Sequence, residues 1–479
     1  MSASYFPLVP QAILLVAGML VMLLEPFTAP HRKHRLGQIT VVAAALAAYS
    51  LAFQWNADQS LFRGMFLVDN FTIFFQWLFL VITAICALVS MRFNEREGID
   101  RGEYYALLLF ACCGMSLMAA SGDLILTFLA IEILSIATYI LAGFKRRDAR
   151  SNESALKYFL LGSFATAFLL YGIALLYGTS GSTSYRQIQA IASLQGTAQV
   201  TAVAGLALLL IGFGFKAALV PFHAWAPDVY EGAPTAVTAF MTVGPKAAAF
   251  AALLRIVSQA VPNMVAAWIP ALWAACILTM ILGNVVAVLQ TNIKRMLAYS
   301  AIAHAGYILI GFVVNSRDGF AAVLFYLVGY TVMNLGALSV VLSLSGRGDT
   351  RVTLEDYAGL GRTAPFAAAA LSVFLISLAG IPLTGGFIGK LYLFSAAVKA
   401  GYIGLTIVAV LNSVVSVYYY FRIMVVMYMS EAAEPGAGPV PIATPVLAIF
   451  AIAVIAVLWL GIYPAGILNL ATHSIPVLK

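Results

Sequence analysis

The chain divides along nearly its whole length into apolar runs of about 20 residues, the length at which a helix crosses roughly 30 Å of hydrocarbon. Lipid offers no partners for open backbone groups, so helices and closed barrels are the only structures that span it. Of the 479 residues, 62% are hydrophobic and 9% are charged, which excludes an ordinary soluble domain. These runs therefore predict an all-α, polytopic membrane protein.

Hydropathy and helix-breaking residues predict about fourteen transmembrane helices. We expect them near residues 8–25, 38–54, 69–91, 105–120, 122–143, 155–178, 200–222, 234–258, 266–289, 297–314, 320–345, 366–400, 402–428 and 443–463. When the connections are assigned alternately to two sides, most loop Lys and Arg residues fall on one side. Basic loops are typical of the cytoplasmic side, so both termini are predicted to face outward.

Four charged residues lie at depth inside these predicted helices: Glu132, Lys216, Lys246 and Lys390. Each charge at the bilayer centre costs roughly 2.5–3.5 kcal/mol on insertion scales, and such residues usually mark an ion or proton path. His304 adds an imidazole that titrates near neutral pH. A static ion pair between Glu132 and one lysine is the structural alternative, but it leaves two lysines without an acidic partner. For His304, a simple helix contact is an equally good interpretation.

Two of the lysines lie next to a predicted break in their helix, Lys216 before one break and Lys390 after the other. Pro221 and Pro227 follow Lys216 in GFGFKAALVPFHAWAPDVYEGAP, whereas SLAGIPLTGGFIGKLYLF is interrupted just before Lys390. Corresponding breaks in two halves of a transporter point to its working site, because a break frees backbone groups for protein or water partners.

The two broken spans are five predicted helices apart, so they cross the membrane in opposite directions. If the spans between them are repeats, the repeats are inverted. The expected organisation is an N-terminal three-helix segment at 1–104, two inverted five-helix repeats at 105–258 and 259–428, and a C-terminal helix with its tail at 429–479.

Polar residues also line the predicted helix at 234–258. Thr235, Thr238, Thr242 and Lys246 form a row from its cytoplasmic end to mid-membrane. Such a row can hold water, although threonines in membrane helices usually hydrogen-bond to the backbone of their own helix. The sequence has no nucleotide-binding glycine loop, no metal-spaced Cys/His cluster and no nucleophile elbow.

The chain resembles the antiporter-like membrane subunits of respiratory complex I and of multi-subunit cation/proton antiporters. The resemblance rests on the segment around Glu132 and on GFGFKAALVPFHAWAPDVYEGAPTAVTAFMTVGPKAAAFAALLRI, TNIKRMLAYSAIAHAGYILIG and LAGIPLTGGFIGKLYLF. Lys390 is unlike the glutamate of M-type subunits, and we expect no long lateral helix of the L-type. The N-type subunit is therefore the nearest match within the family.

The resemblance implies a role for each candidate residue. Glu132 and Lys216 would form the family's ion pair, and Lys246 would be the central relay. His304 matches a relay position, Lys390 would be the lysine nearest the outward exit, and Glu153 matches an auxiliary acidic position.

The resemblance also implies a proton-translocating membrane subunit of a bacterial NADH-quinone oxidoreductase. Such a translocase subunit moves protons from cytoplasm to periplasm in the inner membrane and has no redox chemistry, cofactor or metal of its own. FMN, iron–sulfur clusters and quinone are expected on partner subunits. The expected partners are neighbouring antiporter-like subunits, the lateral helix of the L-type subunit and the lipid bilayer, with no nucleic acid.

Two alternatives stay open at this point. A subunit of a multi-subunit Na⁺/H⁺ antiporter would use the same polar residues, driven by an existing gradient. A structural scaffold would use the charges only to pair helices, and it predicts that neutralising Lys246 leaves pumping intact.

Overall fold

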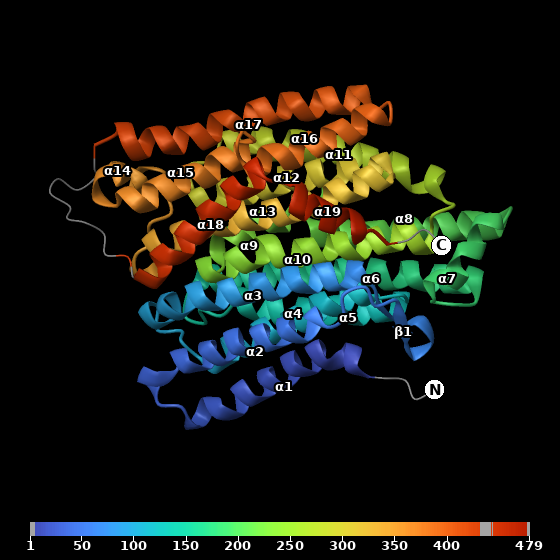
Figure 1. Ribbon diagram of the computed structural model, residues 1–479, viewed down its shortest axis with the longest axis horizontal. Helices are drawn as coiled ribbons and strands as arrows, with labels where there is room; N and C mark the ends of the chain where they lie inside the picture. The colour runs from blue at the N-terminus through green and yellow to red at the C-terminus, as the bar shows by residue number, and fades with distance from the viewer. Residues whose placement is uncertain (1–4, 432–441, 443, 477–479) are drawn as a thin grey trace. The chain divides into compact units, whose positions relative to one another are not determined.

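Helices account for almost the whole of the computed structural model, which describes residues 5–431, 442 and 444–476 (Figure 1). Among these residues, thirteen helices are long and apolar enough to cross a membrane. The pair 355–363 and 365–379, bent by 118°, raises the count to fourteen if it forms one span. The predicted all-α membrane fold is thus confirmed. Residue 443, where the last span was expected to begin, lies outside the described residues.

The spanning helices agree with the predicted ranges to within a few residues at most of their ends. They are α1 Val9–Leu24, α2 His34–Ala52, α3 Asn70–Arg96, α4 Gly102–Ala120, α5 Leu124–Ala142, α6 Ala149–Ser180, α8 Thr197–Ala217, α10 Thr235–Arg255, α11 Val265–Val288, α12 Ile293–Val314, α13 Arg317–Leu344, α17 Ile403–Met429 and α18 Thr444–Ile462.

Both predicted helix breaks are present. The helix α8 ends at Ala217, Ala218 adopts the left-handed conformation at φ 56°, and a short helix α9 follows at Trp225–Gly232. The predicted span at 366–400 is divided into α15 Pro365–Ala379 and α16 Gly385–Lys399. Gly380, at φ 85°, ends α15, and the Thr384 side chain caps α16. Each break therefore separates two helices beside a lysine, Lys216 or Lys390.

Short elements outside the spans were not predicted. Strands β1 Gln59–Leu61 and β2 Phe66–Val68 pair antiparallel, with Gln59 opposite Val68. Further helices are α7 Tyr185–Ile188, α14 Leu360–Thr363 and α19 Ala465–His473. Short 3-10 turns lie at Phe6–Leu8, Glu25–Phe27, Pro30–Arg32, Phe62–Gly64, Gln189–Ser193, Arg347–Asp349 and Glu355–Tyr357, and a π-helical turn follows α10 at Ile256–Ala260.

The chain divides into two compact units. The first contains residues 1–218, 244–272 and 473–479, and the second contains residues 219–243 and 273–472. In the first unit, α6 and α8 approach closely where Gly172 faces the backbone of Gly205, a contact that small residues permit between membrane helices. In the second unit, α12 and α13 are buried over most of their length. The sequence boundaries of the two proposed repeats stay a prediction.

Candidate functional site

In the first unit, Lys216 contacts residues on the helix face that carries Glu132. Glu132 lies on α5, and its Oε1 accepts a hydrogen bond from Thr166 Oγ1 on α6 at 2.9 Å. Lys216 Nζ, on α8, donates to Ser135 Oγ at 2.7 Å and to Tyr139 Oη at 3.4 Å. Ser135 and Tyr139 follow Glu132 by three and seven residues, a spacing that places all three on one face of α5. Glu132 and Lys216, both described, form no ion pair within 4 Å, and Ser135 takes the lysine's hydrogen bond instead.

Aromatic rings surround the rest of the Lys216 ammonium. Its Nζ lies 5.3 Å from the ring centre of Tyr139, 5.8 Å from that of Tyr158 and 5.7 Å from that of Phe215. A ring face attracts a cation, so these contacts hold the charge without a carboxylate. Lys216 is buried in this setting.

Lys246 lies on α10, the helix that is buried along its full length. Its own side chain is 1% exposed. Pro245 precedes it and has no N–H to donate, which leaves the carbonyl of Met241 without its helical partner. The Tyr230 hydroxyl donates to that carbonyl at 3.3 Å. The helix therefore continues through the proline, and Lys246 stays on the buried row.

Two hydroxyls of the threonine row on α10 donate to backbone carbonyls. Thr238 Oγ1 donates to the carbonyl of Tyr230 at 2.7 Å, and Thr242 Oγ1 donates to the carbonyl of Ala239 at 3.1 Å. Thr242 thus bonds within its own helix, as the structural alternative predicts, whereas the nearest acceptor of Thr238 lies on α9. Only the hydroxyl lone pairs are left to receive water.

His304 lies on α12 in the second unit, between two tyrosines. Its Nδ1 is 2.7 Å from the Tyr326 hydroxyl and its Nε2 is 3.2 Å from the Tyr420 hydroxyl. The Tyr420 hydroxyl also hydrogen-bonds to Ser300, one turn before His304. The ring of Tyr307 packs against the imidazole with centres 5.7 Å apart. Both ring nitrogens therefore have a partner that can either donate or accept a proton.

Lys390 is bound at the second helix break. Its Nζ donates to the carbonyls of Leu378 at 3.2 Å and Ala379 at 2.9 Å, and to Ser413 Oγ at 2.8 Å. The two carbonyls are the last of α15, which has no further turn to satisfy them and carries the negative end of the helix dipole. The Tyr307 ring centre lies 4.8 Å from the ammonium. Tyr307 thus contacts both His304 and Lys390.

Glu153 is apart from these groups. It lies near the start of α6, its side chain is 63% exposed, and it pairs with Lys157 one turn later at 2.8 Å. Exposed pairs of this kind contribute little to stability.

Two further buried cations lie at helix ends. Arg255, the last residue of α10, is fully buried and donates from both Nη atoms to Asp69 at 2.8 Å. Lys294, in the first turn of α12, donates to the carbonyl of Ala233 at 2.7 Å and to Asp349 at 3.3 Å. Both positions lie at the edge of apolar runs, so hydropathy alone could not separate them from loop residues.

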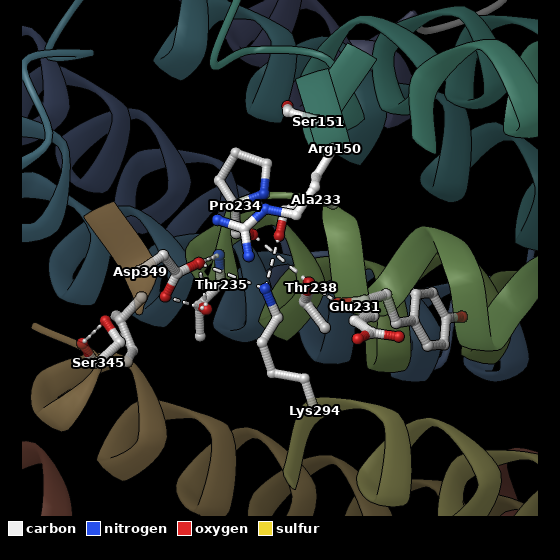
Figure 2. Close-up of polar contacts among 12 residues, drawn as sticks. Arg150, Ser151, Glu231, Ala233, Pro234, Thr235, Thr238, Lys294, Ser345 and Asp349 are labelled. Carbon is white, nitrogen blue, oxygen red and sulfur yellow. Dashed lines mark hydrogen bonds and ion pairs between the residues drawn. The ribbon is translucent and has the colours of Figure 1, made fainter. Parts of the chain in front are cut away.

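Lys294, Asp349 and Thr235 form a hydrogen-bonded cluster at the start of α10 (Figure 2). Asp349 accepts from the Thr235 backbone N–H at 3.0 Å and from Thr235 Oγ1 at 2.7 Å. Thr235 was predicted as the outermost member of the threonine row, whereas Asp349 was not predicted at all. Within the described residues, no group of three or more His, Cys, Asp or Glu side chains could hold a metal ion.

Comparison with known proteins identifies similar chains along the whole sequence. The family described as NADH:quinone oxidoreductase/Mrp antiporter, transmembrane, matches residues 121–416. The chain is 45% identical to NADH-quinone oxidoreductase subunit N 1 of Solibacter usitatus over 470 residues, covering 98% of this chain and 97% of that protein. It is also 45% identical to NADH-quinone oxidoreductase subunit N of Trichlorobacter lovleyi, with the same coverage of both chains.

Solved structures have the same fold. A chain of respiratory complex I from Thermus thermophilus with bound aureothin is 35% identical, with a TM-score of 0.80 over 97% of this chain and 99% of that one. A chain of the Mrp complex from Dietzia sp. has a TM-score of 0.84 over 97% of both chains, but at 22% identity that likeness concerns the fold alone.

Proposed function

The chain belongs to the NADH:quinone oxidoreductase/Mrp antiporter family of transmembrane proteins, and from that membership we propose how its buried residues carry protons. It is a multi-pass, proton-translocating membrane subunit of an NADH-quinone oxidoreductase, as its full-length relatives indicate. The redox energy comes from electron transfer elsewhere in that complex. What the chain itself must supply is a set of groups that take up, hold and release protons.

We assign those roles to the buried residues. Lys246 is the central relay, Glu132 and Lys216 form a switchable pair, His304 is a relay, and Lys390 is the group nearest the outward exit. The contacts of Lys216 support the pair, because Ser135 and three rings hold the ammonium near Glu132 without locking the two charges together. Glu153 is an auxiliary acidic residue in this scheme, with an exposed position that suits contact with a partner.

One observation supports the proposal most directly, namely the setting of Lys390 on the carbonyls of a broken helix. Two backbone oxygens and a hydroxyl stabilise the charged ammonium without fixing it to a carboxylate. An amine held by neutral groups can gain or lose its proton without leaving a buried carboxylate unpaired. His304 reaches the same lysine through the Tyr307 ring, so the second unit contains a relay and an exit group side by side.

The test compares two lysines of the same helix. Lys390→Ala should strongly reduce proton pumping per NADH oxidised in an assembled complex. Lys399→Ala is the control, because Lys399 is 72% exposed and pairs with Asp318 at the surface. Equal pumping by both variants and the wild type would contradict the role of Lys390.

We propose the following setting for the subunit. It lies in the bacterial inner membrane with both termini outward, against neighbouring antiporter-like subunits and the lateral helix of the L-type subunit. FMN, iron–sulfur clusters and quinone are bound by partner subunits. The Na⁺/H⁺ antiporter alternative is supported by the family description, which also covers Mrp antiporters, and by the fold likeness to the Mrp complex. NADH-driven pumping in sodium-free buffer separates the two functions, since an antiporter subunit would require the sodium gradient.

A further inference from the structure

A connecting loop is fastened to the start of α10 by a buried carboxylate (Figure 2). Residues 345–354 follow α13 in the second unit. From this loop, Asp349 accepts the backbone N–H and the hydroxyl of Thr235, the first residue of α10. Lys294 of α12 bridges the two sides by donating to Asp349 and to the carbonyl of Ala233. Asp349, Thr235 and Lys294 are all buried.

The loop is held in place by backbone contacts as well. Ile293 N–H donates to the carbonyl of Val352 at 2.7 Å, and Leu354 N–H donates to that of Thr291 at 2.9 Å. Asp349 itself has φ 58°, in the left-handed region that residues other than glycine seldom adopt. Such a conformation persists only where surrounding contacts over-determine it, and here they are the bonds to Thr235 and Lys294.

This arrangement goes beyond ordinary helix capping. The N-terminus of a helix is usually capped by the residue just before its first turn, but that position in α10 is Pro234, whose side chain accepts no hydrogen bond. The cap comes instead from a residue 114 positions later in the chain. The first N–H of α10 therefore has this cap only while the loop is docked.

The helix end that the loop closes is where the threonine row begins. Thr238 and Thr242 follow Thr235 along α10, and both direct their hydroxyl protons to backbone carbonyls. Lys246 lies eleven positions after Thr235, which is roughly 16 Å along a helix. With the loop docked, the hydroxyls of Thr235, Thr238 and Thr242 all donate to protein oxygens.

We propose that Asp349 and Lys294 are positioning residues that latch the loop at 345–354 over the cytoplasmic end of the threonine row. The latch closes the row between uptake events, and its release lets water reach Thr238. This inference rests on the proposed proton uptake toward Lys246. It adds a gate at the mouth of that path, formed by residues outside the relay itself.

The test uses the whole complex carrying Thr238→Cys and a water-soluble thiol reagent added from the cytoplasmic side. The four native cysteines are buried, so background labelling is low. Adding Asp349→Asn should raise the labelling rate about tenfold or more, since losing a hydrogen bond to a charged group shifts an equilibrium by at least that factor. Asparagine tolerates the left-handed conformation, so this change removes the charge without adding backbone strain. Lys294→Gln gives a second variant that leaves the loop sequence intact.

Asp356→Asn is the matched control in the neighbouring segment. The exposed Asp356 carboxylate accepts from the Thr353 N–H at 2.8 Å and from the Thr353 hydroxyl at 2.7 Å. It should leave labelling unchanged. In the complex with only Thr238→Cys, NADH turnover should accelerate labelling, whereas the Asp349→Asn complex should label fast without NADH. A purely structural role would not produce that difference.

Unchanged labelling in both latch variants, or an equal rise in the Asp356→Asn control, would overturn the latch. The readout is chemical access, so it is independent of whether Lys390 or Lys246 carries protons. A failure of the proposed relay would appear in pumping while the labelling pattern stayed as expected.

Discussion

At the scale of single residues, four of the buried cations fall into two kinds. Arg255 and Lys294, at helix ends, are bonded to the carboxylates of Asp69 and Asp349. Lys216 and Lys390, beside the helix breaks, are bonded to hydroxyls and carbonyls and lie against aromatic rings. A cation bonded to a carboxylate is held by its partner's charge, whereas neutral partners leave the amine free to change its charge. The second kind suits proton transfer.

Gly380 tests whether the position of Lys390 matters. A Cβ at Gly380 would lie 2.8 Å from Lys390 Cδ and 3.1 Å from its Nζ, so Gly380→Ala should displace the ammonium from its carbonyls. The change also places alanine at φ 85°, at a cost of about 1–2 kcal/mol. Gly401→Ala bears the same φ with nothing within 4 Å, and serves as the control. We expect both variants to lose some thermal stability but only Gly380→Ala to lose pumping. A matching loss of pumping in both would show that backbone strain is responsible.

Glu132 and Lys216 should behave as coupled residues. Glu132→Gln and Lys216→Ala each disturb the charge balance around Ser135, so the double variant should assemble better than the sum of the two losses predicts. The measurement is the amount of assembled complex in a double-mutant cycle. Glu153→Gln, which breaks an exposed pair, should change assembly little. Strict additivity would argue that Glu132 and Lys216 do not interact.

At the scale of elements, sequence patterns predicted the helices and both breaks but not the long-range contact that caps the start of α10. Apolar runs and Gly/Pro positions are local signals, so α8 ends beside Lys216 and α15 ends beside Lys390 as expected. The bonds from Asp349 to Thr235 join residues 114 positions apart, and no local pattern marks such a partner. The hairpin of β1 and β2 was missed for a related reason, because three-residue strands carry too little periodicity. The roles of the candidate site residues stay predictions.

The end of α10 opposite Thr235 should be held by Arg255 and Asp69. Burial alone would raise the pKa of Asp69, but the Arg255 guanidinium and hydrogen bonds from Thr72 outweigh it and hold the pKa below its ordinary value of 3.8. The pair therefore stabilises the fold above the unfolded pKa of about 3.9, and this contribution is lost as the pH falls through the lowered folded value.

Asp69→Asn should accordingly destabilise the protein at pH 7. The Asp69 side chain is 28% exposed, so we expect the lower end of the roughly 3–5 kcal/mol seen when a buried pair is broken. Thermal unfolding in detergent measures the effect. The difference in stability between the variant and the wild type should become smaller below about pH 3.9. Asp318→Asn, at an exposed pair with Lys399, should cost at most about 1 kcal/mol. A stability difference between Asp69→Asn and the wild type that grows on acidification would be inconsistent with this account.

At the scale of the whole molecule, each of the two units contains at least one buried lysine that we assign to proton transfer. The first holds the buried Lys216 and Lys246 and the half-buried Glu132, and the second holds the buried His304 and Lys390. The predicted inverted repeats give this distribution a simple origin, since each repeat would bring one broken helix and its lysine. Length, hydropathy and the two breaks were sufficient to predict the fold, and full-length relatives support the function.

The most direct test of the account is the number of protons pumped per NADH oxidised by the purified complex in sealed proteoliposomes, with Lys246 replaced. Lys246→Ala should abolish or strongly reduce that ratio while the complex still assembles. Lys246→Arg should not restore it fully, because a guanidinium hardly releases its proton at any accessible pH. A wild-type ratio in a fully assembled Lys246→Ala complex would contradict the central claim and favour the scaffold interpretation.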